Sequence, residues 1–159
     1  MEFDFKKTNP VIKLEDFKKL KSSTSGSKDL HEKLLKSSAF LQSDYPFYGE
    51  MLLKFSYHET DMIPTAGVNA TKDFRFNFYY NSEFLNYLNQ KENNFVIVHE
   101  IFHILFNHPV RVGDRNHTIS NLAQDMIINE IINRDLVNKF PNHFSFPHDK
   151  ETGEQMGFM

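Results

Sequence analysis

The feature that most constrains this chain is the segment VIVHEIFHILFNHP, residues 96–109, which places two histidines and a glutamate inside one of its most apolar runs. The apolar residues have the spacing of a buried helix, and Pro109 ends that helix. A helix over about 92–107 puts His99 and His103 on one face, because four residues correspond to about 40° of rotation. Burying such polar groups is costly unless they have partners. The chain must therefore fold around a buried polar cluster.

Two imidazoles on adjacent turns of one helix face can bind a single metal ion. Glu100 follows the first histidine, where a carboxylate accepts the proton of a metal-activated water, as in the H-E-x-x-H motif. The chain has no cysteine, so any metal must be held by His, Asp or Glu. The pattern predicts one zinc ion per chain, with His99 and His103 as ligands and Glu100 as general base. The alternative interpretation is a pair of hydrogen-bonded core histidines.

A catalytic zinc site usually has three protein ligands, so a third ligand must come from elsewhere in the chain. Asp125 is the strongest candidate, since it interrupts a second apolar helix, expected over about 121–140, where a carboxylate needs a partner. His108 and His117 remain alternatives. His108 would point away from the metal face if the first helix continued, and His117 falls in a polar loop expected over 110–120.

Several further polar residues flank these ligands. Asn121 and Asn129 lie four residues before and after Asp125 on the same helix face, where they can orient the carboxylate or the histidines. A reaction that develops an oxyanion also needs hydrogen-bond donors. The candidates for this role are Tyr79, Tyr80, His108, Arg111 and His117. Packing is the alternative role for the tyrosines, and loop solvation is the alternative for the arginine.

The segments before the histidine helix predict an α+β fold. Residues 28–42 have the spacing of an amphipathic helix. Two short extended segments, 64–69 and 74–80, flank the polar turn NATKD and predict a hairpin. We therefore expect a small mixed sheet or hairpin that packs on the histidine helix and on the metal-ligand helix that follows it.

The length of the chain suits one domain with a single hydrophobic core. We expect residues 1–159 to form that domain, with a helical extension and a flexible break over 1–27 and the core over 28–140. Residues 141–159 have no clear period, which predicts an irregular tail. This tail is either naturally short or cut from a longer chain.

Composition and charge exclude several classes of protein. The N-terminus lacks the apolar core of a signal peptide, and no apolar run approaches about 18 residues. We therefore expect a cytoplasmic protein that does not bind membranes. The formal net charge of -3 argues against a dedicated nucleic-acid binder.

Four blocks of sequence resemble, in order, the metallopeptidase domain that precedes von Willebrand A-like domains in bacterial and phage proteins. These blocks are IPTAGV (63–68), FYYNSEFL (78–85), VIVHEIFHILFNHPVRVGDR (96–115) and NLAQDMIIN (121–129). The resemblance spans about residues 40–140 and implies a zincin-like fold, of the compact kind whose third ligand is an acidic residue on the following helix. His99, His103 and Asp125 then correspond to the zinc ligands and Glu100 to the general base.

These observations predict a zinc metallopeptidase that hydrolyses a polypeptide substrate. Zincin substrates commonly lie along a strand edge, here either 64–69 or 74–80. The alternative is a zinc-containing, non-catalytic interaction or assembly module, because the family is associated with von Willebrand A-like domains and MoxR-type AAA ATPases. A zinc hydrolase with another kind of substrate ranks last, since the sequence has no phosphate-cradling glycine loop and no second metal cluster.

Overall fold

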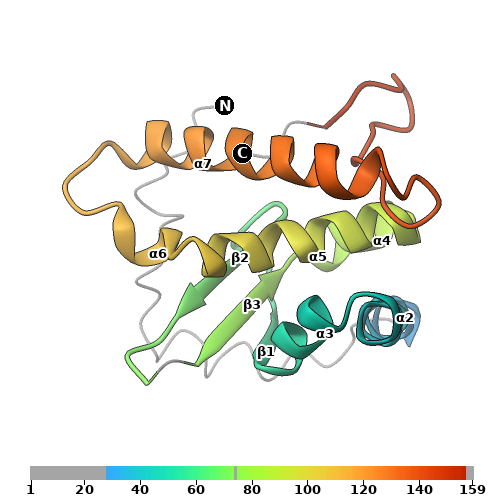
Figure 1. Ribbon diagram of the computed structural model, residues 1–159, viewed down its shortest axis with the longest axis horizontal. Helices are drawn as coiled ribbons and strands as arrows, with labels where there is room; N and C mark the ends of the chain where they lie inside the picture. The colour runs from blue at the N-terminus through green and yellow to red at the C-terminus, as the bar shows by residue number, and fades with distance from the viewer. Residues whose placement is uncertain (1–27, 74, 157–159) are drawn as a thin grey trace.

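The computed structural model describes residues 28–73 and 75–156 (Figure 1). The extension and break expected over residues 1–27 lie outside this part of the chain. None of the helices described is long and apolar enough to cross a membrane. The elements are α2 (Lys28–Asp44), α3 (Pro46–Leu53), β1 (Phe55–Glu59), β2 (Ala66–Ala70), β3 (Phe76–Tyr80), α4 (Ser82–Tyr87), α5 (Gln90–Leu105), α6 (His108–Arg111), α7 (His117–Ile132) and a π-helical turn, η1 (Asn133–Val137).

Helix α5 is the centre of the molecule. It packs between α7 on one side and the sheet with α2 and α3 on the other (Figure 1). Every residue from Glu92 to Ile101 is buried, so the helix is enclosed on all faces. A capping box begins it: the Asn89 side chain accepts from the Glu92 amide at 3.0 Å, and the Glu92 carboxylate accepts from the Asn89 amide at 2.8 Å. The predicted histidine helix is thus the element around which the fold is built.

The three strands form a mixed sheet in the order β1-β3-β2. β2 and β3 pair antiparallel, which confirms the expected hairpin, and β1 runs parallel to β3. Phe78, on the central strand, is fully buried against the core. Two strands were candidates for binding a substrate along their edge, β2 and β3. Because β3 is the central strand of the described sheet, only β2 has a free edge. The fold is therefore α+β, with the small mixed sheet that the sequence predicts.

The segment from Pro46 to Leu53 forms the short helix α3. Proline occupies the first turn of α3, where its missing N–H is not needed. The following glycine, Gly49, packs against α2 so closely that a Cβ placed on it would lie 2.5 Å from the Cα of Gln42. A residue without a side chain is therefore required where these two helices meet.

The C-terminal segment packs into the core although it contains little regular structure. Phe144 is fully buried, and the ring of Phe146 lies 4.4 Å from that of Phe95 on α5. The backbone amide of His148 donates to the Glu92 carboxylate at 3.0 Å. The hydrophobic core thus includes part of the segment that the sequence analysis treats as a tail.

Candidate metal centre

Three side chains from α5 and α7 converge on one point. The Nε2 atoms of His99 and His103 lie 3.1 Å apart. The Asp125 Oδ1 atom lies 3.3 Å from the first of these nitrogens and 3.0 Å from the second. His99 and Asp125 are buried, and His103 is half-buried. The structure therefore brings together the three side chains that the sequence analysis proposes as ligands.

The hydrogen bonds of these atoms indicate which kind of ion the space between them favours. The Nδ1 atom of His99 lies 2.9 Å from the Oδ1 atom of Asn129, which can only accept. Nδ1 therefore carries the proton of a neutral His99, and Nε2 carries a lone pair. This lone pair faces the Asp125 carboxylate and the Nε2 atom of His103. Such an electron-rich group is stabilised when a cation lies at its centre.

The donor atoms also have a spacing that suits zinc. Zinc binds His nitrogen and carboxylate oxygen at about 2.0–2.2 Å, so two ligand atoms of a tetrahedral site lie roughly 3.3 Å apart. The three separations here, 3.0, 3.1 and 3.3 Å, are close to that value. The residues therefore fit a zinc ion held by two imidazoles and one carboxylate.

Glu100 supplies a second carboxylate beside this group. The donor atoms of His99, Glu100 and His103 all lie within 4.8 Å of one another. The Asp125 Oδ1 atom lies well inside this limit from both histidine nitrogens, at 3.3 and 3.0 Å. Burial raises the pKa of Glu100 to about 7, although the charge of His103 acts in the opposite direction. The neighbouring Asp125 carboxylate contributes to the upward shift.

The two buried carboxylates have different charge states. Burial alone would raise the pKa of Asp125, but the neighbouring side chains of His103 and His99 together outweigh burial and hold the pKa below its ordinary value. Asp125 is therefore ionised at neutral pH, whereas Glu100 is poised between its two forms. A permanent anion suits a metal ligand, and a group that titrates near neutrality suits a general base.

His108 reaches the cluster because the chain turns sharply after α5. Asn107 has a left-handed backbone conformation, with φ 56° and ψ 32°, and α6 begins at the next residue. The Nδ1 atom of His108 thereby lies 3.0 Å from the Nδ1 atom of His103. This contact is on the side of the His103 ring that faces away from Asp125, so His108 contacts one member of the trio from outside. Burial lowers the pKa of His108 to about 4, and His103 contributes to this shift.

Asn107 is the residue that places His108, and the sequence motifs alone do not reveal this role. Asn is the non-glycine residue that most readily adopts a left-handed conformation, and a proline follows two residues later. These two features together were the available signal for a sharp turn. The expectation that His108 would point away rested on a continuous helix, which this turn interrupts.

Arg111 and His117 lie at the ends of the short segments that follow. The Arg111 guanidinium donates to the Phe106 carbonyl at 3.4 Å, so it caps the C-terminal end of α5. His117 is exposed and is the first residue of α7, not part of a loop. The Asn116 side chain caps that helix by accepting from the Ile119 amide at 3.1 Å.

The remaining candidates lie on β3 and α7. Tyr80 is half-buried, and its ring packs against the core beside Phe78. Tyr79 points to the other face of the sheet, where its ring stacks on His58 at a centroid distance of 5.2 Å. Asn121 is half-buried, one turn before Asp125. Among these residues, the tyrosine rings contribute to packing of the sheet.

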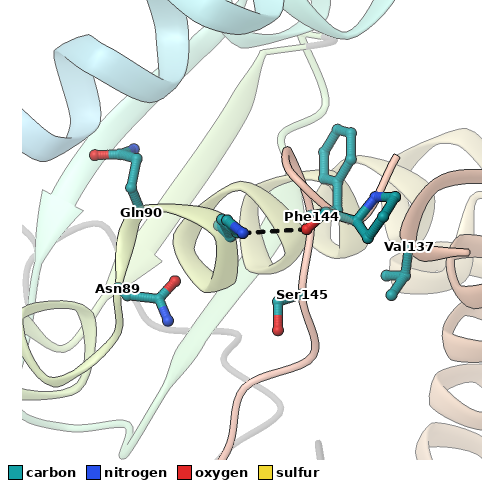
Figure 2. Close-up of a pocket in the computed structure, with 7 residues that line it drawn as sticks. Asn89, Gln90, Val137, Phe144 and Ser145 are labelled. Atoms are coloured by element: carbon teal, nitrogen blue, oxygen red, sulfur yellow. Dashed lines mark hydrogen bonds between the residues drawn. The ribbon is translucent and has the colours of Figure 1, made fainter. Parts of the chain in front are cut away.

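A separate hollow of about 480 Å³ lies at the other end of α5 (Figure 2). Its lining residues are Asn89, Gln90, Lys91, Val137, Pro141, Phe144 and Ser145. The ammonium group of Lys91 donates to the Pro141 carbonyl across it, at 3.2 Å. Along the helix axis this hollow lies roughly 13–20 Å from the two histidines. It is therefore distinct from the cluster of His99, His103 and Asp125.

Comparison with known proteins agrees with this geometry. No curated protein and no solved structure matches the chain significantly. A family model described as "Putative metallopeptidase domain" matches residues 30–156, a range that contains α5, α7 and every donor atom described above. Because this match spans most of the chain, the protein belongs to that metallopeptidase-domain family.

Proposed function

We propose that the protein is a zinc-dependent peptidase of the H-E-x-x-H type, with His99, His103 and Asp125 as zinc ligands and Glu100 as general base. One observation carries the proposal: two imidazole nitrogens and a carboxylate oxygen lie within 3.3 Å of one another. A buried glutamate lies beside them. Membership of the metallopeptidase-domain family supports the same assignment.

The proposed chemistry divides between the metal and Glu100. A zinc ion held by His99, His103 and Asp125 would supply Lewis acidity for hydrolysis of a peptide bond. The Glu100 carboxylate accepts the proton of the attacking water and later donates it to the leaving amide nitrogen. Its burial limits exchange of that proton with solvent.

Two further residues hold the ligands in the form that binds metal. Asn129 accepts from Nδ1 of His99. The Nδ1 atom of His108 lies 3.0 Å from that of His103, and we assign His108 as the acceptor in this contact. Both contacts keep the proton on Nδ1 and turn the Nε2 lone pair toward Asp125. Such contacts fix the tautomer and the ring orientation of metal ligands.

The polypeptide substrate is expected to bind along β2. This strand ends the described sheet and packs against α5 and α6, the helices that carry His103 and His108. An extended peptide can add to such an edge through backbone hydrogen bonds. This arrangement would bring a peptide bond toward the exposed side of the ligand group.

Zinc content of purified protein is the first test. Elemental mass spectrometry of wild type is expected to give about one zinc per chain. His103→Ala and Asp125→Ala should lose the metal or bind it at least about 100-fold more weakly, because each removes a ligand. Gln124→Ala is the matched control, since Gln124 is half-buried on the same helix next to Asp125. Folded, zinc-free wild type in zinc-containing buffer would contradict the proposal.

Cleavage of a peptide library separates catalysis from metal binding. Wild type should cleave, and Glu100→Gln should bind zinc with cleavage reduced at least about 100-fold, the size expected for loss of a general base. Zinc binding without cleavage in wild type would favour the non-catalytic alternative. In that case a von Willebrand A-like domain or an AAA ATPase becomes the partner to test.

A further inference from the structure

Helix α7 exposes an apolar stripe on the face opposite the metal centre. Its members recur at intervals of three and four residues, so they share one face of the helix. They are Ile119, Leu122, Ala123, Met126 and Ile127. Ile119 and Met126 retain 66% and 65% of their accessible surface. We call this set the α7 stripe.

The polar contacts on the inner face of α7 explain why its apolar residues are exposed to solvent. Asp125 is buried beside the histidines, and Asn129 contacts His99, so the polar face of the helix is turned inward. The metal centre thus determines the rotation of the helix. Ile128 and Ile132 are the only apolar residues of α7 that are fully buried in the core. A contiguous apolar stripe left in solvent is a common mark of a protein interface.

The stripe is complementary to a second copy of itself. When two α7 helices lie antiparallel about a two-fold axis near residues 122–123, Ile119 of each copy faces Met126 of the other. Leu122 then lies against Ala123, so that a large side chain meets a small one. A two-fold interface requires this kind of self-complementary surface.

Charges at the two ends of the stripe favour the same arrangement. Glu130 is exposed on the same face as Ile119, because eleven residues return a helix to nearly the same direction. Arg115 is exposed immediately before α7. The antiparallel arrangement brings Glu130 of each copy beside Arg115 of the other. Arg134, near Glu130, is already paired with Asp135 at 2.6 Å.

We propose that the α7 stripe is the interface of a homodimer with antiparallel α7 helices. Five side chains per copy are few compared with the roughly 20–30 of a standard interface, so we place the dissociation constant in the micromolar range. The metal centre faces away from the interface and stays accessible in the dimer. Packing of the partner against α7 also holds the helix that carries Asp125.

Sedimentation velocity over about 1–100 µM protein tests the proposal, on metal-free and zinc-loaded samples alike. Wild type is expected to shift from monomer to dimer over this range. Ile127→Glu should weaken the dimer at least about tenfold, since it places a charge in the stripe. Leu53→Glu is the matched control: Leu53 is an equally exposed apolar residue on α3, and its replacement should leave the dimer unchanged. Because both positions are exposed, circular dichroism should show that both variants remain folded.

A charge exchange tests the orientation of the helices. Glu130→Arg and Arg115→Glu should each weaken self-association, because each places like charges opposite one another. An equimolar mixture of the two variants should recover a dimer, since every contact in the heterodimer then pairs opposite charges. A monomeric wild type at all concentrations, or a dimer insensitive to Ile127→Glu, would overturn the interface. A mixture no stronger than its components would overturn the antiparallel arrangement.

Discussion

Helices α5 and α7 contribute the same cluster of donor atoms but are held in the protein in different ways. From Glu92 to Ile101, α5 is buried on every face, whereas α7 buries only Asp125, Ile128 and Ile132. His99 is therefore fixed by the hydrophobic core, and His103 follows one turn later on the same helix. The aspartate is fixed largely by the polar contacts it makes. The comparison shows that packing of the hydrophobic core positions the part of the cluster on α5. The part on α7 depends on the polar contacts within the cluster.

The largest expected effect comes from the same substitution made in both helices. Ile101→Ala should lower the free energy of unfolding by about 2–5 kcal/mol, because it removes a fully buried side chain and leaves a cavity. Ile127→Ala should change it by less than about 0.5 kcal/mol in dilute protein, since Ile127 is 58% exposed. Urea unfolding of both variants measures the difference. Equal destabilisation would show that α7 is as firmly packed as α5.

The second prediction concerns how the stability of the metal-free protein depends on pH. The pKa of Glu100 rises from 4.5 to about 7 on folding, so the folded state binds an additional proton between these values. The contribution of Glu100 to the free energy of unfolding is therefore largest below pH 4.5. It decreases by roughly 3 kcal/mol in total as the pH rises to 7. Glu100→Gln should be free of this loss, and the stability difference between variant and wild type should grow over this window.

Only the difference between the two proteins is diagnostic here. The pKa values of His108 and Asp125 are lowered on folding, so their contributions to stability decrease as the pH falls. These opposite contributions are common to wild type and Glu100→Gln and cancel in the comparison. Urea unfolding in chelator at several pH values provides the measurement. A constant difference between the proteins from pH 4.5 to 7 would contradict the raised pKa.

The third prediction addresses the polar contacts of α7. Asn129→Ala should weaken zinc binding about 10–100-fold, because His99 loses the acceptor that fixes its tautomer. Asn121→Ala, two turns earlier on the same helix, is the matched control and should weaken binding much less. Competition with a chromophoric chelator measures both affinities. Nitrogen NMR of the imidazole rings should show a mixed tautomer of His99 in the metal-free Asn129→Ala variant alone.

The smallest expected effect compares the two N-caps. Asn89→Ala should cost about 1–2 kcal/mol, because it disrupts a reciprocal capping box and leaves the backbone amide of the buried Glu92 without its acceptor. Asn116→Ala should cost about 0.5–1 kcal/mol, since it removes a single hydrogen bond at the exposed start of α7. Thermal unfolding of the two variants is sufficient to rank them. The reverse order would mean that α7 depends more than α5 on its own local structure.

Much of the centre could be predicted because its determinants are local. The four-residue spacing of His99 and His103 fixes their common face on any helix, and Pro109 marks where that helix must end. Asp125 was recognisable because a carboxylate within an apolar helix needs a partner. These inferences depend on backbone geometry and on the cost of burial, which the sequence contains directly.

The parts that could not be predicted depend on competition between distant groups. Apolar residues such as Leu122 and Met126 usually point to the core, yet on α7 the polar face is turned inward and both are exposed. The sequence pattern alone does not say which face of a helix is buried when a polar cluster and the apolar core compete for it. The position of His108 depended likewise on a single left-handed residue, and the parallel pairing of β1 with β3 joins segments about 20 residues apart.

The contacts of Glu92 determine how short a functional fragment of this protein can be. One carboxylate completes the capping box of α5 and also binds the backbone of His148, while Phe144 fills the core beneath. A protein cut near residue 140 would leave this carboxylate and the surrounding apolar surface open to water. Limited proteolysis of the native chain should therefore spare residues 141–148, and expression of the domain requires at least these residues.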